Sequence, residues 1–342
     1  MPKGQFRSTL IVLAASSLVY FGCGGDDSAG PDNKIPPEPT WVTYNTSNSG
    51  LTDNDVTGIA IEPSGVKWFT TDGGFINKLS GGNWTTFNTT NTGGHVTCCL
   101  WAVAIDATNN NKWFSSWAFG VTVHDGDIWT SYTPWNSQLS DAYVGAIACD
   151  NAGNAWFGTE EHGVSMFDGT TWTTYDTLTS DIAHNHISAI AIDPSGHPWF
   201  GTSGLGVSEF DGTTWTTFNH HNSGLALDYV NAIDFHPANN TVWFGTFGGG
   251  VSVLNGDVWT TFNSSNSGLP SNYVRAIVID GAGTAWIGTD PGGLAKYDGT
   301  NWTVYNTSNS EIASNKVMAI AIDPSGNKWI ATYGAGVSKL HE

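Results

Sequence analysis

The side chains of this chain that could do chemistry stand at variable positions in an otherwise regular sequence. They are aromatic rings, which pack well against sugars or apolar groups, together with a few acidic, basic and amide groups that form hydrogen bonds. The candidates for ligand binding are Trp117, Phe119, Tyr143, Glu161, His162, His186, Tyr229, Asn231, Phe247, Tyr273, Arg275 and Tyr333. This set suits recognition of a carbohydrate or a peptide, and we assign none of its members to catalysis.

These positions become visible because the surrounding sequence repeats. Residues 187–215 form one copy, in which Trp199 and Trp215 are the landmarks. The equivalents of Trp199 are Trp68, Trp113, Trp156, Trp243, Trp286 and Trp329. The equivalents of Trp215 are Trp41, Trp84, Trp129, Trp172, Trp259 and Trp302. We call the tryptophans equivalent to Trp199 the inner tryptophans and those equivalent to Trp215 the outer tryptophans. Each inner tryptophan except the last is followed by an outer one 16 residues later, and each outer tryptophan by the next inner one 27 to 29 residues later. The resulting repeat of 43 to 45 residues is in the range of propeller blades.

Each copy predicts four short strands. Residues 187–192 are an apolar run of the kind that forms a strand covered on both faces, and the DPSG turn at 193–196 follows. The next strands are expected at 197–202, 207–210 and 213–218, the last after an Asp-Gly hairpin signal. One such sheet cannot bury both faces alone, so the copies must pack against one another in a ring.

The two ends of the repeat region complement each other. The last copy stops at its third strand, residues 336–340, without an outer tryptophan, whereas the first begins with an unmatched outer strand at 41–44. We therefore predict an all-β fold, a seven-bladed β-propeller of four-stranded antiparallel blades. The N-terminal strand would complete the last blade, which leaves no long open edge.

The N-terminal residues predict export and a lipid anchor. Residues 1–23 contain Lys3 and Arg7, a short apolar run and Gly22-Cys23, which fits a lipoprotein signal peptide with Cys23 as the lipidated residue. An ordinary cleaved signal peptide is the alternative. Residues 24–40 predict a disordered tether and residues 41–342 the propeller. The expected location is the bacterial cell envelope, as an outer-membrane lipoprotein that faces the periplasm or the cell surface.

The charge restricts the partners. The net charge is −19, whereas nucleic acid and anionic lipid require basic patches. We therefore expect no nucleic-acid partner and contact with the membrane only through the N-terminal lipid. The expected partner is an extracellular ligand, a carbohydrate or a peptide, with another envelope protein as a further possibility.

No cofactor or metal is predicted. Histidines 162, 184, 186, 220 and 221 all fall on loops of one face and could converge on a transition metal, but no carboxylate stands at a diagnostic spacing from them. Cys98 and Cys99 are adjacent, and the sequence leaves open whether they form a vicinal disulfide or remain two free thiols.

The repeat V-x-A-I-A-I-D-x-x-G-x-x-W-F-G-T-x-x-x-G-V-S-x-F-D-G-x-x-W-T-T-Y-N resembles the two-component regulator propeller repeat. The likeness extends from Trp41 to Leu340. It implies an extracytoplasmic sensor-type propeller, often tied to glycan use, and it carries no catalytic residues. Two residues follow Leu340, so we expect a free-standing propeller without the kinase of those sensors.

Three functions are compatible with these patterns. We expect a non-catalytic ligand-binding or sensor-like propeller, and binding rather than enzymatic activity. A propeller lyase or hydrolase that acts at the mouth of the channel, with His162 or His186 and Glu161 as acid and base, is the first alternative. A cell-surface scaffold for protein interactions is the second.

Overall fold

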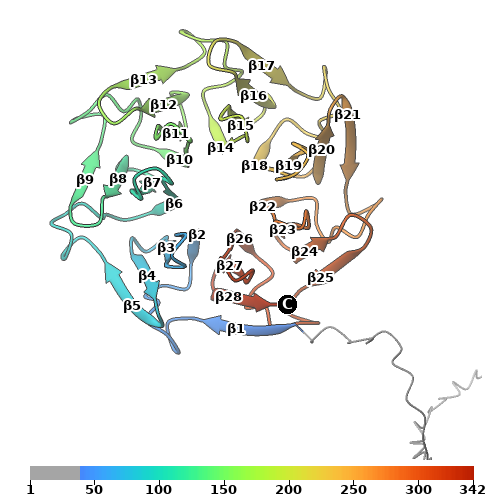
Figure 1. Cartoon of the computed structure of the whole chain (residues 1–342), viewed down its shortest axis with the longest axis horizontal. Coiled ribbons are helices and arrows are strands. Elements are labelled where there is room, and N and C mark those ends of the chain that lie inside the picture. Colours follow the sequence, from blue (N-terminus) through green and yellow to red (C-terminus); the bar gives the residue numbers. More distant parts are fainter. Residues whose placement is uncertain (1–38) are drawn as a thin grey trace, which may run out of the picture. The chain divides into compact units, whose positions relative to one another are not determined.

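A computed structural model describes residues 39–342, and the predicted signal peptide, Cys23 and all but the last two residues of the tether lie outside this range. The described chain forms seven four-stranded antiparallel sheets arranged in a ring (Figure 1). Residues of all seven innermost strands line a central channel. This confirms the predicted seven-bladed propeller. Among residues 39–342 no helix is long and apolar enough to cross a membrane.

The strands occupy equivalent places in every blade. The innermost strands line the channel: β2 (Val56–Ile61), β6 (Leu100–Ile105), β10 (Val144–Cys149), β14 (Ile187–Ile192), β18 (Val230–Phe235), β22 (Val274–Ile279) and β26 (Val317–Ile322). The second strands are β3 (Lys67–Thr71), β7 (Lys112–Ser116), β11 (Ala155–Thr159), β15 (Pro198–Thr202), β19 (Val242–Thr246), β23 (Ala285–Thr289) and β27 (Lys328–Thr332). The third strands are β4 (Ile76–Ser80), β8 (Val121–His124), β12 (Val164–Phe167), β16 (Val207–Phe210), β20 (Val251–Asn255), β24 (Gly293–Tyr297) and β28 (Gly336–His341). The outermost strands are β5 (Asn83–Phe87), β9 (Trp129–Tyr132), β13 (Trp172–Tyr175), β17 (Trp215–Phe218), β21 (Val258–Phe262), β25 (Trp302–Tyr305) and β1 (Thr40–Tyr44).

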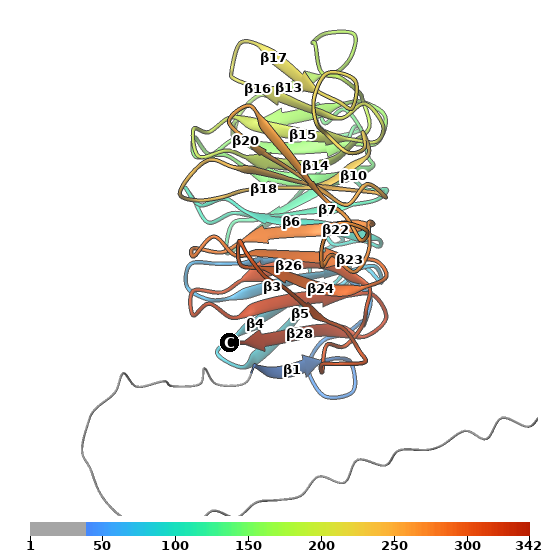
Figure 2. The same cartoon turned by 90° about the vertical axis from the view of Figure 1, so that its right-hand side faces the viewer.

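The N-terminal strand closes the ring as predicted. β1 pairs antiparallel with β28, from Thr40 opposite His341 to Tyr44 opposite Val337. The last blade, blade 7, therefore runs β26, β27, β28, β1, and the two strands lie side by side in both Figure 1 and the edge-on view of Figure 2. β1 begins at Thr40, one residue before the propeller boundary predicted at Trp41.

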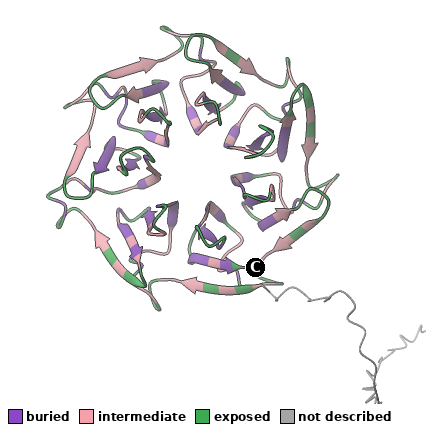
Figure 3. Ribbon diagram, viewed as in Figure 1, coloured by how far each residue is buried: buried purple, intermediate pink, exposed green. Residues whose placement is uncertain are grey.

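The hydrophobic core lies between neighbouring sheets, where Figure 3 shows the second strands and the adjoining parts of their neighbours as buried. Each inner tryptophan is at most 6% exposed. Each outer tryptophan contacts the last aromatic residue of the preceding blade, with ring centroids 5.1 to 6.0 Å apart. These pairs are Trp41–Tyr305, Trp84–Tyr44, Trp129–Phe87, Trp172–Tyr132, Trp215–Tyr175, Trp259–Phe218 and Trp302–Phe262. The regular spacing of the outer tryptophans therefore places one aromatic contact between every pair of neighbouring blades.

One carboxyl group breaks this apolar pattern. Asp234 in β18 occupies a place that is alanine or valine in the other blades, and its Oδ2 accepts a hydrogen bond from the backbone N–H of Ile279 in the next blade at 2.6 Å. Burial raises the pKa of the Asp234 carboxyl to about 6, although backbone hydrogen bonds oppose the shift. Ionisation therefore costs more in the folded state than in the unfolded chain.

We expect Asp234→Asn, which keeps an acceptor for Ile279, to stabilise the fold increasingly as the pH rises. Because the folded pKa lies above the unfolded value, the wild-type chain loses stability between about pH 4 and pH 6, whereas the amide does not titrate. The difference in free energy of unfolding between the two proteins should grow by about 2–3 kcal/mol from pH 4 to pH 8. Urea unfolding at both pH values measures it, and a constant difference would contradict the assignment.

Candidate functional site

The mouth of the channel is the end at which the loops between outermost and next innermost strands emerge. The register of every innermost strand shifts after its first residue, as at Val144/Ala146 and Val230/Ala232. Such a β-bulge re-aims a side chain. The residues at these bulges are Thr57, Trp101, Gly145, Ser188, Asn231, Arg275 and Met318. The variable positions predicted from the sequence therefore form a ring at the mouth.

Three members of this ring also connect neighbouring blades. Thr57 Oγ1 donates to the Leu100 carbonyl at 2.9 Å, Ser188 Oγ to the Val230 carbonyl at 2.6 Å, and Asn231 Nδ2 to the Val274 carbonyl at 3.3 Å. These side chains have a structural partner already. A ligand would therefore have to share their remaining hydrogen-bonding capacity.

A second ring of variable residues is held by the backbone. The residue four places after each inner tryptophan donates its N–H to the carbonyl of the residue just before an innermost strand, at 2.9 to 3.1 Å in all seven blades. The donors are Asp72, Trp117, Glu160, Ser203, Phe247, Asp290 and Tyr333, and the acceptors are Asp55, Cys99, Tyr143, His186, Tyr229, Tyr273 and Lys316. The same backbone hydrogen bond thus holds these loops in every blade, while the side chains that they carry at the mouth differ.

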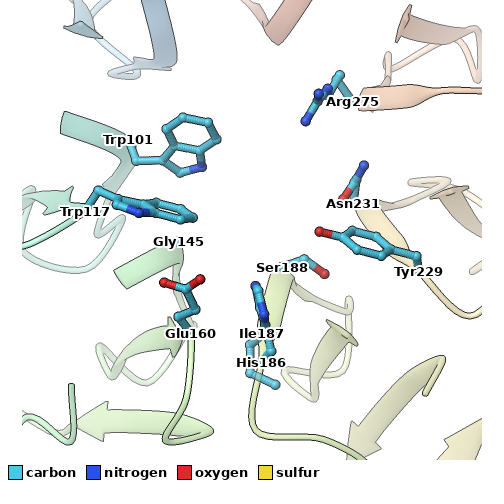
Figure 4. A pocket seen from close by; sticks show the side chains of 10 residues that line it. All are labelled: Trp101, Trp117, Gly145, Glu160, His186, Ile187, Ser188, Tyr229, Asn231 and Arg275. Carbon is cyan, nitrogen blue, oxygen red and sulfur yellow. The ribbon is translucent and has the colours of Figure 1, made fainter. Parts of the chain in front are cut away.

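These two rings enclose a pocket on one side of the mouth, which we call the mouth pocket. It has a volume of about 210 Å³ and draws residues from blades 2 to 6. Its lining consists of Trp101, Trp117, Gly145, Glu160, His186, Ile187, Ser188, Tyr229, Asn231 and Arg275. In Figure 4 the two tryptophans lie on one side, Tyr229, Asn231 and Arg275 lie opposite, and Glu160 and His186 reach in between them.

Aromatic rings form two walls of the mouth pocket. Trp101 and Trp117 pack against each other with centroids 5.2 Å apart and planes inclined by 55°. Tyr229 packs on Phe247 at 5.3 Å, and Phe247 contacts Tyr273 at 5.0 Å. Because each ring is supported by a neighbour, little conformational entropy remains to be lost when a ligand binds.

Arg275 supplies the positive charge of the pocket. Its guanidinium group is 3.4 Å from Asp290 Oδ2 and 5.3 Å from the centroid of Phe247, so its position is fixed from two sides. Its Nε is buried and has no hydrogen-bond partner among the described residues. A guanidinium has five N–H donors, and Asp290 occupies only part of them.

Glu160 and His186 supply groups that could exchange protons. Burial lowers the pKa of His186; Glu160 opposes this shift and His184 adds to it. The imidazole is therefore neutral near pH 7 and acts as a donor and an acceptor. The His186 backbone N–H donates to His184 Nδ1 at 2.8 Å, which fixes the loop just before β14.

The predicted site residues divide into two groups. Trp117, His186, Tyr229, Asn231 and Arg275 line the mouth pocket. The others stay outside it: Phe247 packs behind Tyr229, whereas Phe119, Tyr143, Tyr273 and Tyr333 are 42 to 45% exposed on the same face. Asp141 Oδ2 holds both the Glu161 N–H at 3.2 Å and His162 Nδ1 at 3.1 Å, which occupies that pair with a structural contact.

The pocket is also lined by five residues that were not among the predicted ligand contacts: Trp101, Gly145, Glu160, Ile187 and Ser188. Glu160 could have been found from the sequence, because it stands four residues after Trp156, as Trp117 does after Trp113. Counting from the inner tryptophan thus selects Glu160 over Glu161. Gly145 has no side chain of its own, which leaves the space beside Trp117 open to a ligand.

The mouth histidines and the paired cysteines make local contacts. His220 Nδ1 pairs with Asp228, and its ring lies 3.7 Å from that of His221. Within residues 39–342 the mouth histidines do not gather into a group of three metal ligands. Cys98 and Cys99 are free thiols in this structure, with sulfur atoms 2.9 Å apart.

Comparisons with known proteins agree with this fold. The model of the two component regulator propeller family matches residues 138–161 and 268–290. No curated protein sequence matches the chain. Similar solved structures include the extracellular domain of the proposed hybrid two component system BT3049 from B. thetaiotaomicron, which is 20% identical with a TM-score of 0.73 over 88% of this chain and 41% of that one.

Two further structures extend the comparison. PorZ from Porphyromonas gingivalis, a surface component of the type-IX secretion system, is 18% identical with a TM-score of 0.70 over 86% of this chain and 48% of its own. Virginiamycin B lyase from Staphylococcus aureus is 17% identical with a TM-score of 0.71 over 89% of this chain and 100% of its own. The chain thus spans less than half of the first two proteins, and these likenesses show the fold alone.

The family match falls on two blades, and the same inner-tryptophan strand, outer-tryptophan strand and turns recur in the other five. The chain is therefore a seven-bladed propeller in which two blades match the two component regulator propeller repeat and the other five share its pattern.

Proposed function

We propose that the chain is a non-catalytic, extracytoplasmic ligand-binding propeller of the sensor type, which holds its ligand in the mouth pocket. One observation carries this proposal. Seven nearly identical blades present different residues at the mouth, and the differences in blades 2 to 6 produce one pocket with aromatic walls and polar groups between them. A pocket of this composition is the usual form of a small-molecule site.

The size and chemistry of the mouth pocket favour one sugar ring as the buried part of the ligand. A cavity of about 150 Å³ holds a benzene molecule, whereas sites for whole drug-sized ligands are about 300 Å³ or larger. At about 210 Å³ the pocket falls between these limits. Trp117 and Tyr229 can pack on the faces of the ring, while Glu160, Asn231 and Arg275 can hydrogen-bond its hydroxyl groups. A peptide with one aromatic side chain is the alternative ligand of the same size.

The experiment that tests this proposal is a binding screen with the full chain. Isothermal titration against a panel of mono- and oligosaccharides and short aromatic peptides should find a ligand that also changes tryptophan fluorescence, because Trp101 and Trp117 line the pocket. A ligand that binds without changing the tryptophan fluorescence would indicate a binding site other than the mouth pocket. A chain that binds no member of either class would contradict the proposal.

A lyase is the second candidate, favoured by Glu160 and His186 in the same pocket. A neutral imidazole beside a carboxylate can remove or deliver a proton. Virginiamycin B lyase has the same fold over its whole length, so virginiamycin B is the natural probe. Its turnover by the wild-type chain but not by His186→Asn would support this candidate. A chain that binds a ligand and leaves it unchanged supports the sensor function.

We further propose that the propeller is held at the membrane by a lipid on Cys23. Cys23→Ser should move the protein from the membrane fraction to the soluble fraction, because serine lacks the thiol to which the lipid would be attached. Immunoblots of the two fractions and mass spectrometry of the mature N-terminus measure this. A serine variant that remains with the membrane, or a wild-type N-terminus without acyl groups, would contradict the anchor.

This location suits a partner in the cell envelope. The propeller covers 41% of the solved extracellular domain of the proposed system BT3049 and 48% of the surface component PorZ, so both of those chains contain further residues beside the propeller. In either role, transfer of the bound ligand to an envelope protein or service as a scaffold in a surface complex, the partner protein would cover part of the mouth face. Co-purification of the full chain from its native envelope, with and without the identified ligand, distinguishes these roles.

A further inference from the structure

The face opposite the mouth carries one group of side chains that differs from its counterparts in the other blades. Asp193 and His197 lie in the turn between β14 and β15 of blade 4, and Glu209 lies in β16 opposite Trp199. One potential ligand atom from each lies within 4.8 Å of the other two. All three side chains are partly buried, with 15%, 37% and 23% of their surface exposed.

The position of Glu209 never holds an acid in the other blades. Its equivalents, each opposite an inner tryptophan, are Lys78, Val123, Met166, Val253, Lys296 and Lys339. The three lysines lie over the ring of the inner tryptophan, with Nζ 5.2 to 5.7 Å from its centroid. Blade 4 thus replaces a cation or an apolar group with a carboxylate that faces a second carboxylate, Asp193.

Asp193 is also freed from the role that its counterparts perform. In blades 3, 6 and 7 the turn aspartate accepts a hydrogen bond from the inner tryptophan Nε1 at 2.9 to 3.1 Å. In blade 4 the Nε1 of Trp199 is buried and has no hydrogen-bond partner among residues 39–342, as is also true of Trp243 in blade 5, where His236 replaces the turn aspartate. Asp193 Oδ1 accepts the N–H groups of Ser195 and His197, each at 2.8 Å, while Oδ2 lies 3.7 Å from His197 Nδ1.

The distances from His197 to the two carboxylates suit a shared metal ion as well as an ion pair with a protonated imidazole. His197 Nδ1 is 3.7 Å from Asp193 Oδ2 and 3.8 Å from Glu209 Oε1, both longer than a hydrogen bond. Ligand atoms of a tetrahedral zinc ion with bonds of about 2.1 Å stand about 3.4 Å apart, so shifts of a few tenths of an ångström would suffice for these two pairs. Among residues 39–342 neither carboxylate has a lysine or arginine within 4.0 Å to balance its charge.

We propose that Asp193, His197 and Glu209 bind one divalent transition-metal ion, with Zn²⁺ as the ion of choice for one imidazole and two carboxylates. The ion neutralises the two acids and ties the turn of blade 4 to β16. Three protein ligands leave a fourth coordination position for water. The oxygen of that water is the kind of hydrogen-bond acceptor that the buried Trp199 N–H lacks. The site lies on the face opposite the mouth pocket and is independent of the ligand proposed there.

The repeat itself supplies substitutions that should leave the fold intact. His197→Asn introduces the residue found at the equivalent positions of Asn154 and Asn327, and Glu209→Met introduces that of Met166. His162→Asn is the matched control, because His162 also pairs with an aspartate, Asp141, but on the mouth face. Circular dichroism and melting in EDTA should be the same for all four proteins.

Titration of the full chain with ZnCl₂ tests the proposal. We expect one site in the wild type and in His162→Asn, with affinity at least tenfold weaker in His197→Asn and Glu209→Met. Saturating Zn²⁺ should raise the wild-type melting temperature by about 3 to 8 °C relative to EDTA and should not raise that of the two site variants. Wild-type affinity in both variants would place the ion elsewhere, for example on Cys98 and Cys99, and would overturn the proposal, as would a wild type that binds no Zn²⁺ at millimolar concentration.

Discussion

Removal of β1 should lower the free energy of unfolding by about 4 kcal/mol or more. β1 contributes Trp41, which packs on Tyr305 of blade 6, and Tyr44, which packs on Trp84 of blade 1 and stacks on Trp329 of blade 7 at 5.5 Å. Two of the seven contacts between outer aromatic residues therefore depend on this strand. Truncation of one buried large aromatic side chain typically costs about 3–5 kcal/mol, and the loss of β1 also exposes the edge of β28.

Urea unfolding of two truncated chains measures this effect. A chain that begins at Pro39 keeps β1 and should match the full chain, whereas one that begins at Asn45 lacks it. Within β1, Tyr44→Ala should be strongly destabilising, while Val42→Ala should change the stability by less than about 0.5 kcal/mol, because Val42 is 47% exposed. Equal midpoints for the two truncations would mean that β1 does not close the ring.

The fold could be predicted from the sequence because its determinants are local and repeated. Trp199 is buried for the same reason as Trp286, so seven copies of one pattern report the same environment. The closing strand could be predicted by counting the strands of each blade, because no outer tryptophan follows β28 whereas an unmatched one stands at Trp41. Such inferences require only spacing and the rule that apolar faces must be covered.

The site could be predicted only in outline, because it depends on side-chain directions that no repeat encodes. Trp117 and Tyr229 were found as departures from the pattern, yet Tyr143 and Tyr273 depart from it equally and lie outside the pocket. His162 lies outside the pocket and contacts Asp141, a residue 21 positions away in the sequence, and the repeat pattern gives no sign of this contact. The zinc ligands were hidden for a related reason, since Glu209 joins Asp193 and His197 only through the pairing of β15 with β16.

Trp117→Ala and Tyr229→Ala should each weaken binding of the ligand found in the screen by about tenfold or more. Both rings line the mouth pocket, from opposite sides, and a well-packed aromatic contact typically contributes about 1–3 kcal/mol on truncation. The fold should survive, because neither residue is an inner or outer blade tryptophan. Phe119→Ala is the matched control: Phe119 is 44% exposed on the same loop as Trp117 and lies outside the pocket, so its loss should leave the affinity unchanged.

The aromatic residues of the mouth pocket should differ in how their contributions to ligand binding are coupled. Trp101 and Trp117 contact each other at 5.2 Å, so the effects of Trp101→Ala and Trp117→Ala should not add, whereas those of Trp117→Ala and Tyr229→Ala should add more closely because the ligand separates the two rings. Titration calorimetry of the single and double variants yields both coupling energies. Ser195→Ala, on the opposite face, should have no effect. An affinity that is indifferent to Trp101, Trp117 and Tyr229 together would remove the mouth pocket from the function of this propeller.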